Sequence, residues 1–343
     1  MIDLLVVGGG PAGLAVAIHA VRCGFEVVVA EPRPSPVDKA CGEGLMPSAV
    51  HALHALGVDV SGRPLHGIRY LDATGGRQAE ARFPAGPGLG TRRTVLHEAL
   101  GARAAELGVR VIPHRVRRVT QSDAYVTADG ITARYLVAAD GLHSPTRRAL
   151  GLTTRPPATG RSTPRYGLRR HYAVEPWTDL VEVHWSADCE AYVTPLGPRQ
   201  VGVAILTSRQ LPYDEQLTRF PLLAARLLQA GRTPVRGAGP LRQQARCRVA
   251  GRVLFVGDAA GYVDALTGEG LTLALTAADA LVRCLREGRP QAYERAWCRL
   301  SRSYRLLTRS LLWVRSQPRL APLVTPAAAR FPRLFESAVR LLA

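Results

Sequence analysis

The sequence predicts an α/β fold in which a parallel sheet covered by helices is joined to a separate antiparallel sheet. Three observations predict this arrangement. The N-terminus has the order strand, glycine-rich turn and helix, and residues 253–271 repeat that order near the other end of the chain. The residues between them include segments that alternate apolar and polar side chains with a period of two, which is typical of antiparallel strands. Together these patterns indicate a Rossmann-like domain with an inserted antiparallel sheet.

The first motif lies at the very beginning of the chain. Residues 1–7 form an apolar strand, the stretch from Gly8 to Gly13 fits GxGxxG, residues 14–23 read as a helix, and a strand at 25–30 ends at Glu31. Such glycines let the backbone approach a pyrophosphate at the helix N-terminus, and the acid binds ribose hydroxyls. The residues expected to contact a dinucleotide are Gly8, Gly10, Pro11, Ala12, Gly13 and Glu31. The motif itself does not choose between NAD and FAD.

Two further strands end in acidic turns. A strand at 131–139 is followed by Asp140-Gly141-Leu142-His143-Ser144-Pro145-Thr146-Arg147. A strand at 253–256 is followed by Gly257 and Asp258, and a long helix then begins after Gly268-Glu269-Gly270-Leu271. Amide groups at a helix N-terminus favour an anion, and an acid at the end of a strand can bind cofactor hydroxyls. We therefore expect Asp140, Gly257, Asp258 and the 268–271 segment at the cofactor.

Composition limits the class of protein. The chain of 343 residues is 47% hydrophobic, which is enough for two domains with a sizeable core. No run of 18 uncharged apolar residues occurs and the first strand starts at the N-terminus, so we expect a cytoplasmic protein without signal peptide or spanning helix. The six cysteines form no CxxC pair, which argues against a metal site or disulfides.

The charge is strongly basic. The formal net charge is +18, Lys39 is the only lysine and asparagine is absent. Aromatic residues make up only 6% of the chain and no basic stripe with interleaved aromatics occurs, so a nucleic-acid partner is not expected. An anionic or carrier-bound small-molecule substrate, or a lipid surface, suits the charge better.

A resemblance gives these motifs a common meaning. Together with Cys41-Gly42-Glu43-Gly44-Leu45, they resemble FAD-dependent oxidoreductases of the aromatic hydroxylase (group A flavoprotein monooxygenase) and geranylgeranyl reductase superfamily. The resemblance implies the glutathione-reductase-type, p-hydroxybenzoate-hydroxylase-like fold, with FAD as the resident cofactor and NADPH or NADH as a transient electron donor. It also implies that Arg93 contacts the pyrophosphate region, that Asp140 is associated with FAD, and that the loop at Cys41 lies against the flavin.

The order of the motifs divides the chain. Residues 1–64, 88–150 and 248–290 are expected to form a discontinuous FAD-binding domain. Residues 65–87 and 151–247 are expected to form the substrate domain, with strands at 181–185, 191–194 and 200–205. Residues 291–343 are expected to form a C-terminal helical segment. Tyr293 to Val314 reads as one amphipathic helix with arginines on its polar face; it either packs over the substrate domain or rests on anionic lipid.

The catalytic residues are not assigned by the sequence, since the chemistry is centred on the flavin. Four residues are candidates for the cavity wall: Cys41, Glu43, His184 and Tyr192. On a strand at 181–185, Glu182 and His184 share one side, and on the next strand Tyr192 and Thr194 do. A histidine at such a position is more often a hydrogen-bonded structural residue than an acid or base.

The resemblance leaves two reactions open. The leading hypothesis is an NAD(P)H-driven monooxygenase of secondary metabolism that hydroxylates a phenolic or polyketide-like molecule through a flavin C4a-hydroperoxide. The alternative is a reductase that transfers hydride from FADH2 to an alkene, as the two Gly-Glu-Gly segments suggest. The reductases carry Tyr-x-Trp-x-Phe-Pro where this chain has Glu190 and Thr194, and Pro where it has Ala265. Polar groups buried unpaired against a lipid chain are costly, which favoured hydroxylation.

Overall fold

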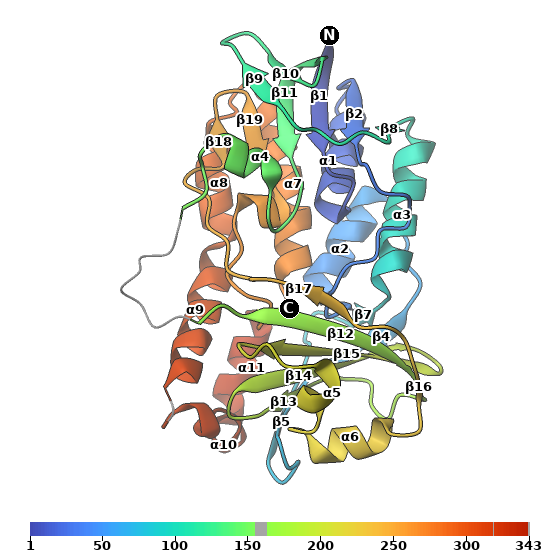
Figure 1. Ribbon diagram of the computed structural model, residues 1–343, viewed down its shortest axis with the longest axis vertical. Coiled ribbons are helices and arrows are strands. Elements are labelled where there is room, and N and C mark those ends of the chain that lie inside the picture. The colour runs from blue at the N-terminus through green and yellow to red at the C-terminus, as the bar shows by residue number, and fades with distance from the viewer. Residues whose placement is uncertain (155–162, 318, 342–343) are drawn as a thin grey trace.

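A largely parallel sheet forms the upper half of the protein in Figure 1, which is a computed structural model that describes residues 1–154, 163–317 and 319–341. Five strands pair in parallel in the order β19 (Val253–Phe255), β11 (Ile131–Ala138), β1 (Ile2–Val7), β2 (Val27–Ala30) and β8 (Arg110–Ile112). Antiparallel pairs add β18 (Val249–Ala250), β10 (Val126–Ala128) and β9 (Val119–Gln121). The predicted Rossmann-like fold is confirmed.

Helices cover this sheet and complete its core. They are α1 (Pro11–Arg22), α2 (Pro47–Leu56), α3 (Arg93–Glu106) and α7 (Gly270–Arg286), with the short α4 (Pro145–Ala149) after β11. Helix α1 begins at a proline, which has no amide hydrogen to lose and a φ suited to a first helical turn. Leu4, Leu5 and Val6 of β1 are fully buried, because this strand is central in the sheet. Burial on both faces explains its continuous apolar sequence.

The second large sheet forms the lower half of the molecule (Figure 1). Its strands follow the order β16 (Gly231–Arg232), β12 (Tyr166–Ala173), β15 (Gln200–Thr207), β14 (Cys189–Gly197), β13 (Val181–Trp185), β5 (Gly67–Asp72) and β6 (Gln78–Arg82), with β17 (Arg236–Ala238) beside β12. Neighbouring strands are antiparallel except β5 and β13. Helices α5 (Tyr213–Leu217) and α6 (Pro221–Leu227) flank it.

A small third sheet lies between these halves. It consists of β3 (Gly44–Leu45), β7 (Gly88–Gly90) and β4 (Arg63–Leu65). Strand β7 also contacts β14 of the second large sheet. Strands from residues 67–82 and 166–238 therefore share one sheet, whereas strands from 2–30, 110–138 and 249–255 share the other. The exact domain limits expected from the sequence remain a prediction.

Strand β12 was not predicted from the sequence. Its residues Tyr166–Ala173 include two arginines and a histidine, which do not resemble a central strand. Even so, Arg169 and His171 are almost fully buried between β15 and the loop at residues 38–43. Their polar groups are tolerated in the interior because acidic partners reach them from that loop, which lies more than a hundred residues away in sequence.

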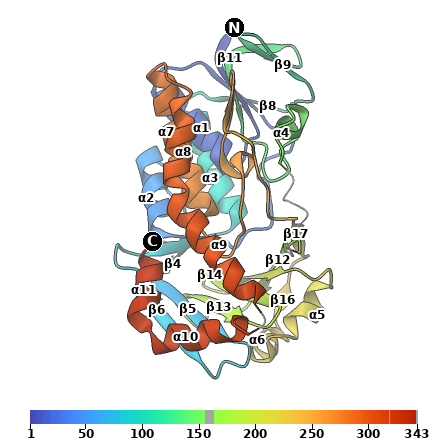
Figure 2. The same cartoon turned by 90° about the vertical axis from the view of Figure 1, so that its left-hand side faces the viewer.

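The C-terminal helices connect the two halves, as Figure 2 shows. Instead of the single helix expected from Tyr293 to Val314, there are two, α8 (Ala292–Leu300) and α9 (Arg302–Ser316), which meet at the buried Ser301. Helix α8 packs on α7, and α9 continues toward the second sheet. After a short turn η2 (Ala321–Leu323), helices α10 (Val324–Arg330) and α11 (Pro332–Arg340) contact β6. None of the helices in the described ranges is long and apolar enough to cross a membrane.

The contact between β7 and β14 gives a test of how closely the halves meet. A Cβ on Gly90 would lie 1.8 Å from the carbonyl oxygen of Pro195, whereas a Cβ on Gly101 of α3 would meet nothing within 4 Å. Gly90→Ala should therefore lower the free energy of unfolding by about 1–3 kcal/mol or more through overpacking. Gly101→Ala, the matched control, should raise it by up to about 1 kcal/mol, because alanine favours a helix interior. Urea denaturation measures both, and a Gly90→Ala protein as stable as the parent would contradict this packing.

Candidate active site

A cavity of about 550 Å³ lies at the carboxyl ends of the parallel strands. Residues that follow β1, β2, β11 and β19 line one side of it, and β12, β15 and β17 line the other. The carboxyl edge of a parallel sheet is where α/β proteins bind dinucleotides. The cavity therefore brings together the three motifs found in the sequence and closes them with the antiparallel sheet.

The first motif forms the turn between β1 and α1. Gly8, Gly10, Pro11 and Ala12 line the cavity, whereas Gly13 lies behind them. A Cβ on Gly13 would come within 1.9 Å of the Gly8 carbonyl oxygen, so only glycine allows the helix to start so close to the strand. The turn directs the N-terminus of α1 toward the cavity, an arrangement that attracts phosphate.

Glu31 lies at the end of β2 and lines the cavity, as the motif predicts. Its carboxylate accepts hydrogen bonds from the amide of Gly9 at 2.9 Å and from the side chain of Arg33 at 2.8 Å. Burial raises the pKa of Glu31, but these hydrogen bonds outweigh burial, so its pKa lies below the usual range. The acid is thus charged, and it fixes the glycine-rich turn as well as facing the cavity.

Two residues that the sequence did not single out support the same turn. Arg33 forms the ion pair with Glu31, and His97 of α3 bonds through Nε2 to the carbonyl oxygen of Gly9 at 2.9 Å. Burial lowers the pKa of His97. No local pattern marks His97, since its partner lies 88 residues away in sequence. Arg33, two residues after Glu31, could have been found as a basic neighbour of the predicted ribose-binding acid.

The second motif places a carboxylate at the cavity, and one oxygen of this carboxylate can still accept a hydrogen bond. Asp140 lines the cavity; its Oδ2 accepts a hydrogen bond from the amide of Thr146 at 2.9 Å, while its buried Oδ1 has no partner among the described residues. The nearby Arg147 is fully buried and donates to the carbonyl oxygen of Ala259 at 2.8 Å. Arg147 therefore joins the second motif to the third and leaves Asp140 facing the cavity.

Arg93 occupies the position expected for a pyrophosphate contact. It is the first residue of α3 and lines the cavity beside the glycine-rich turn, with one terminal nitrogen 3.9 Å from where a Cβ on Gly10 would lie. Its buried Nε has no hydrogen-bond partner among the described residues. A guanidinium group with unused donors at this place suits a phosphate ligand.

The third motif forms a 3-10 turn, η1 (Gly257–Ala260), and the start of α7. Of the predicted residues, Gly257, Asp258, Gly268, Gly270 and Leu271 line the cavity. Glu269 lies behind them. It is 9% exposed, its Oε2 has no partner among the described residues, and burial raises its pKa to about 7. Glu269 is therefore buried behind the lining residues of the third motif and does not reach the cavity surface.

The loop at residues 38–44 carries Cys41 and Glu43 to the boundary of the two halves. Cys41 lines the cavity, and its Sγ accepts a weak hydrogen bond from the amide of Glu43 at 3.4 Å. Burial raises the pKa of the Cys41 thiol, so the protonated form is favoured. Glu43 itself points away from the cavity and adopts a left-handed conformation, with φ of 59°.

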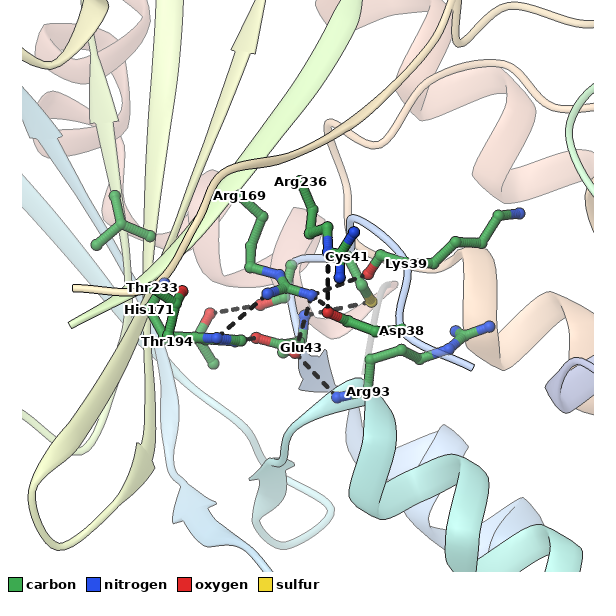
Figure 3. A network of polar contacts seen from close by, with 12 residues as sticks. Asp38, Lys39, Cys41, Glu43, Arg93, Arg169, His171, Thr194, Thr233 and Arg236 are labelled. Atoms are coloured by element: carbon green, nitrogen blue, oxygen red, sulfur yellow. Dashed lines mark hydrogen bonds and ion pairs between the residues drawn. The ribbon is translucent and has the colours of Figure 1, made fainter. Parts of the chain in front are cut away.

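Figure 3 shows what holds this loop in place. Glu43 accepts hydrogen bonds from His171 Nε2 at 2.6 Å and from the Arg93 amide at 2.9 Å. Asp38 forms ion pairs with Arg169 of β12 and, at 3.3 Å, with Arg236 of β17. The loop is consequently bonded both to the helix that carries Arg93 and to the antiparallel sheet above the cavity.

The other two candidates for the cavity wall lie elsewhere. His184 lies on the opposite face of β13, where its ring meets the edge of Phe220 with the ring centroids 6.2 Å apart and its Nε2 contacts Glu182 at 3.2 Å. Tyr192 pairs across the sheet with Ala204, which lines the cavity, but Tyr192 itself does not line it, and its hydroxyl donates to the carbonyl oxygen of Leu266 at 2.7 Å. Strand alternation predicted which residues share a side, but it could not show which side meets the cavity.

Glu190 and Thr194 also differ from the expectation that they would face a substrate unpaired. Glu190 is fully buried and forms ion pairs with Arg165 at 2.7 Å and with Arg315 of α9. The hydroxyl of Thr194 donates to the carbonyl oxygen of Gly42 at 2.8 Å. Both polar groups have partners within the protein, so the argument that they oppose a lipid chain in the cavity is wrong.

These features fit an FAD molecule. Three acids that follow strands, a helix N-terminus behind a glycine-rich turn and an arginine with unused donors provide the groups that a dinucleotide requires. The residues that would hold it are the lining members of the three motifs together with Glu31, Arg93 and Asp140. The apolar side chains that the antiparallel sheet contributes to the cavity would then face the substrate.

Comparisons with known proteins agree with this geometry. Residues 1–181 match the FAD binding domain family. The chain is 31% identical to a menaquinone reductase of Mycolicibacterium smegmatis, over 99% of this chain and 91% of that protein. It is 25% identical to a digeranylgeranylglycerophospholipid reductase of Methanosphaerula palustris, over 86% of this chain and 81% of that protein. It is 29% identical to a para-nitrophenol 4-monooxygenase of a Pseudomonas species, over 82% of this chain and 77% of that protein.

Solved structures share the fold. The flavin-dependent brominase Bmp2 superposes with a TM-score of 0.83 at 17% identity, over 99% of this chain and 93% of that chain. The resemblance inferred from the sequence is confirmed by these relatives, which include both reductases and a monooxygenase. The chain belongs to the FAD binding domain family and is an FAD-dependent oxidoreductase of the superfamily that contains the aromatic hydroxylases and the geranylgeranyl reductases.

Proposed function

We propose that this oxidoreductase reduces a carbon–carbon double bond in the prenyl chain of a lipid, with electrons from NADH or NADPH. The observation that carries the proposal is the composition of the wall opposite the cofactor motifs. Leu168, Leu206 and Leu241 line it together with alanine and glycine residues and with Arg169, whose guanidinium group is paired with Asp38. The thiol of Cys41 lines the same cavity. An apolar wall suits a hydrocarbon substrate.

The residues at this wall have separate roles in such a reaction. Reduction of a double bond requires a hydride and a proton, and reduced FAD supplies the hydride when it is bound. Cys41 supplies the proton, because burial raises its pKa and keeps the thiol protonated until it is used. The thiolate then regains a proton from solvent. Arg93, Glu31 and Asp140 hold the cofactor and take no part in the proton transfer.

The relatives support two different reactions, and the relative with the higher identity and coverage supports reduction. The menaquinone reductase spans nearly the whole chain at the highest identity of the three relatives described above, and menaquinone carries a prenyl chain. The para-nitrophenol 4-monooxygenase supports the alternative, hydroxylation of a phenolic molecule. The pairing of Glu190 and Thr194 within the protein removes the polar groups that argued against a lipid substrate, and we therefore favour reduction over hydroxylation.

A lipid substrate also accounts for the outer surface of the C-terminal helices, for which we propose peripheral contact with an anionic membrane. Trp313 is 59% exposed, Phe331 57% and Leu334 71%. Arginines such as Arg330 and Arg333 lie among them in the sequence. An apolar surface with interspersed cations, in a chain of net charge +18, suits an anionic lipid surface.

The cofactor assignment can be tested at Asp258, which lies in η1 and lines the cavity. Asp258→Ala should raise the Kd for FAD by about 10-fold to 100-fold, the loss expected for a charge-assisted hydrogen bond. Asp279→Ala is the control, since Asp279 is an aspartate of the following helix α7 that does not line the cavity and pairs with Arg283 at 3.0 Å. Fluorescence titration of the apoprotein with FAD measures both constants, and an unchanged Kd for Asp258→Ala would argue against this placement of the cofactor.

The reaction can be tested with menaquinone, NADPH and the FAD-loaded enzyme in the absence of oxygen. We expect a product whose prenyl chain is heavier by two hydrogens. Fragmentation in the mass spectrometer separates this product from one reduced at the quinone ring, which also gains two hydrogens. Cys41→Ala should lower the rate about 100-fold or more, within the range for loss of a general acid, and Cys23→Ala should not, since Cys23 follows α1 away from the cavity.

The same experiment under labelled oxygen tests the alternative. A product formed only with oxygen, and carrying one labelled oxygen atom, would identify a monooxygenase and overturn the reductase proposal. In that case Cys41→Ala should retain most of the activity.

Membrane contact can be tested by sedimentation with phosphatidylglycerol vesicles. Replacing both Phe331 and Leu334 with serine should weaken binding about tenfold or more, because less apolar surface is transferred from water. Leu228→Ser is the control, because Leu228 is 76% exposed but lies beyond α6 in another part of the surface. Equal binding of the parent protein and the double variant would exclude these helices as the lipid contact.

A further inference from the structure

A second cavity, of about 220 Å³, lies beside the C-terminal helices. It is formed by the 242–248 segment, by Trp297 of α8 and by α9. Four arginines line it: Arg242, Arg248, Arg305 and Arg309. No acidic residue lines this cavity among the described residues. The proposed reduction uses none of these groups.

Only one of the four arginines has an acidic partner. Arg248 pairs with Glu294 at 3.1 Å and lies over the Trp297 ring at 4.0 Å. The other three have no carboxylate within 4.0 Å among the described residues. The sequence at 155–162, at 318 and at 342–343 contains no Asp or Glu side chain either.

The crowding of like charges has an electrostatic cost. Burial, together with the nearby Arg309 and Arg248, lowers the pKa of Arg305. An anion placed among the arginines would relieve their mutual repulsion and gain several charge-assisted hydrogen bonds. The cavity therefore has the charge of an anion site without an anionic residue of its own.

Three of the neutral polar side chains at the cavity already donate to groups within the protein. Gln243 Nε2 donates to the Pro240 carbonyl oxygen at 2.9 Å, Thr154 donates to Gln244 Oε1 at 3.4 Å, and the Tyr304 hydroxyl donates to the Asp264 carbonyl oxygen at 2.9 Å. Among the charged groups of the lining, the guanidinium groups of Arg242, Arg305 and Arg309 have no acidic partner among the described residues and can donate to a ligand. We propose that this cavity binds the phosphate group of a ligand, because a planar guanidinium matches the spacing of phosphate oxygens.

The position of the cavity suggests two sources for such a phosphate. Tyr262 lines both this cavity and the one at the cofactor motifs, so the two sites share a wall. On α9, Leu306 follows Arg305 directly and is 67% exposed. A soluble phosphorylated molecule and the headgroup of a phospholipid at the membrane surface both present the chemistry that the arginines recognise.

The proposal can be tested on the FAD-loaded protein by calorimetric titration at constant ionic strength. One probe is inorganic phosphate, and the other is dihexanoylphosphatidylglycerol below its micellar concentration. Arg305→Gln and Arg309→Gln should each weaken binding of at least one probe about tenfold or more. Arg302→Gln is the matched control, since Arg302 is an exposed arginine of α9 that does not line the cavity.

The two probes separate the sources of phosphate. Binding of inorganic phosphate identifies a soluble ligand, and binding of the phospholipid alone identifies a headgroup site. Absence of saturable binding for both probes would overturn the proposal. So would an equal loss of affinity in Arg302→Gln, because the response would then reflect the general positive charge of the surface. The thermal midpoint and FAD content of each variant verify that it is folded.

Discussion

The pairing of β12 with the loop at residues 38–44 is the interaction on which the cavity depends. Glu43 and His171 are both buried and joined at 2.6 Å, and Asp38 pairs with Arg169 beside them. Removing such charges from water is costly, so each must find a partner within the protein. Only when the antiparallel sheet is in place over the parallel one are these partners supplied. The position of β12, which lines the side of the cavity opposite the cofactor motifs, therefore depends on the position of the 38–44 loop.

The cofactor side of the cavity could be predicted because its signals are local. A strand, a glycine-rich turn and a helix follow one another within a few residues, and Glu31, Asp140 and Asp258 each lie within three residues of the end of a strand. In a parallel sheet those ends lie at one edge, which brings distant motifs together without further information. Short-range chemistry was therefore enough to identify the fold and most of the surface that faces the dinucleotide.

The substrate side could not be predicted in the same way. Glu43 and His171 are 128 residues apart, and β12 has the composition of a surface segment until its acidic partners are known. Likewise, Glu190 was expected against the substrate because Arg315, on a helix near the end of the chain, is not identifiable as its partner from sequence. Alternation along a strand assigns side chains to two faces, but the packing of the whole molecule decides which face is which.

The break at Ser301 has a consequence for how the protein is made. Because α8 lies on the helices of the parallel sheet while Arg315 of α9 pairs with Glu190 of the antiparallel one, this last part of the chain connects two halves that are already complete. During synthesis the ribosome releases residues 302–316 only after every wall of the cofactor cavity has emerged. The nascent protein therefore passes through a stage in which the 38–44 loop and β7 already hold the two sheets together, and the ion pair between Arg315 and Glu190 is a connection that is added last.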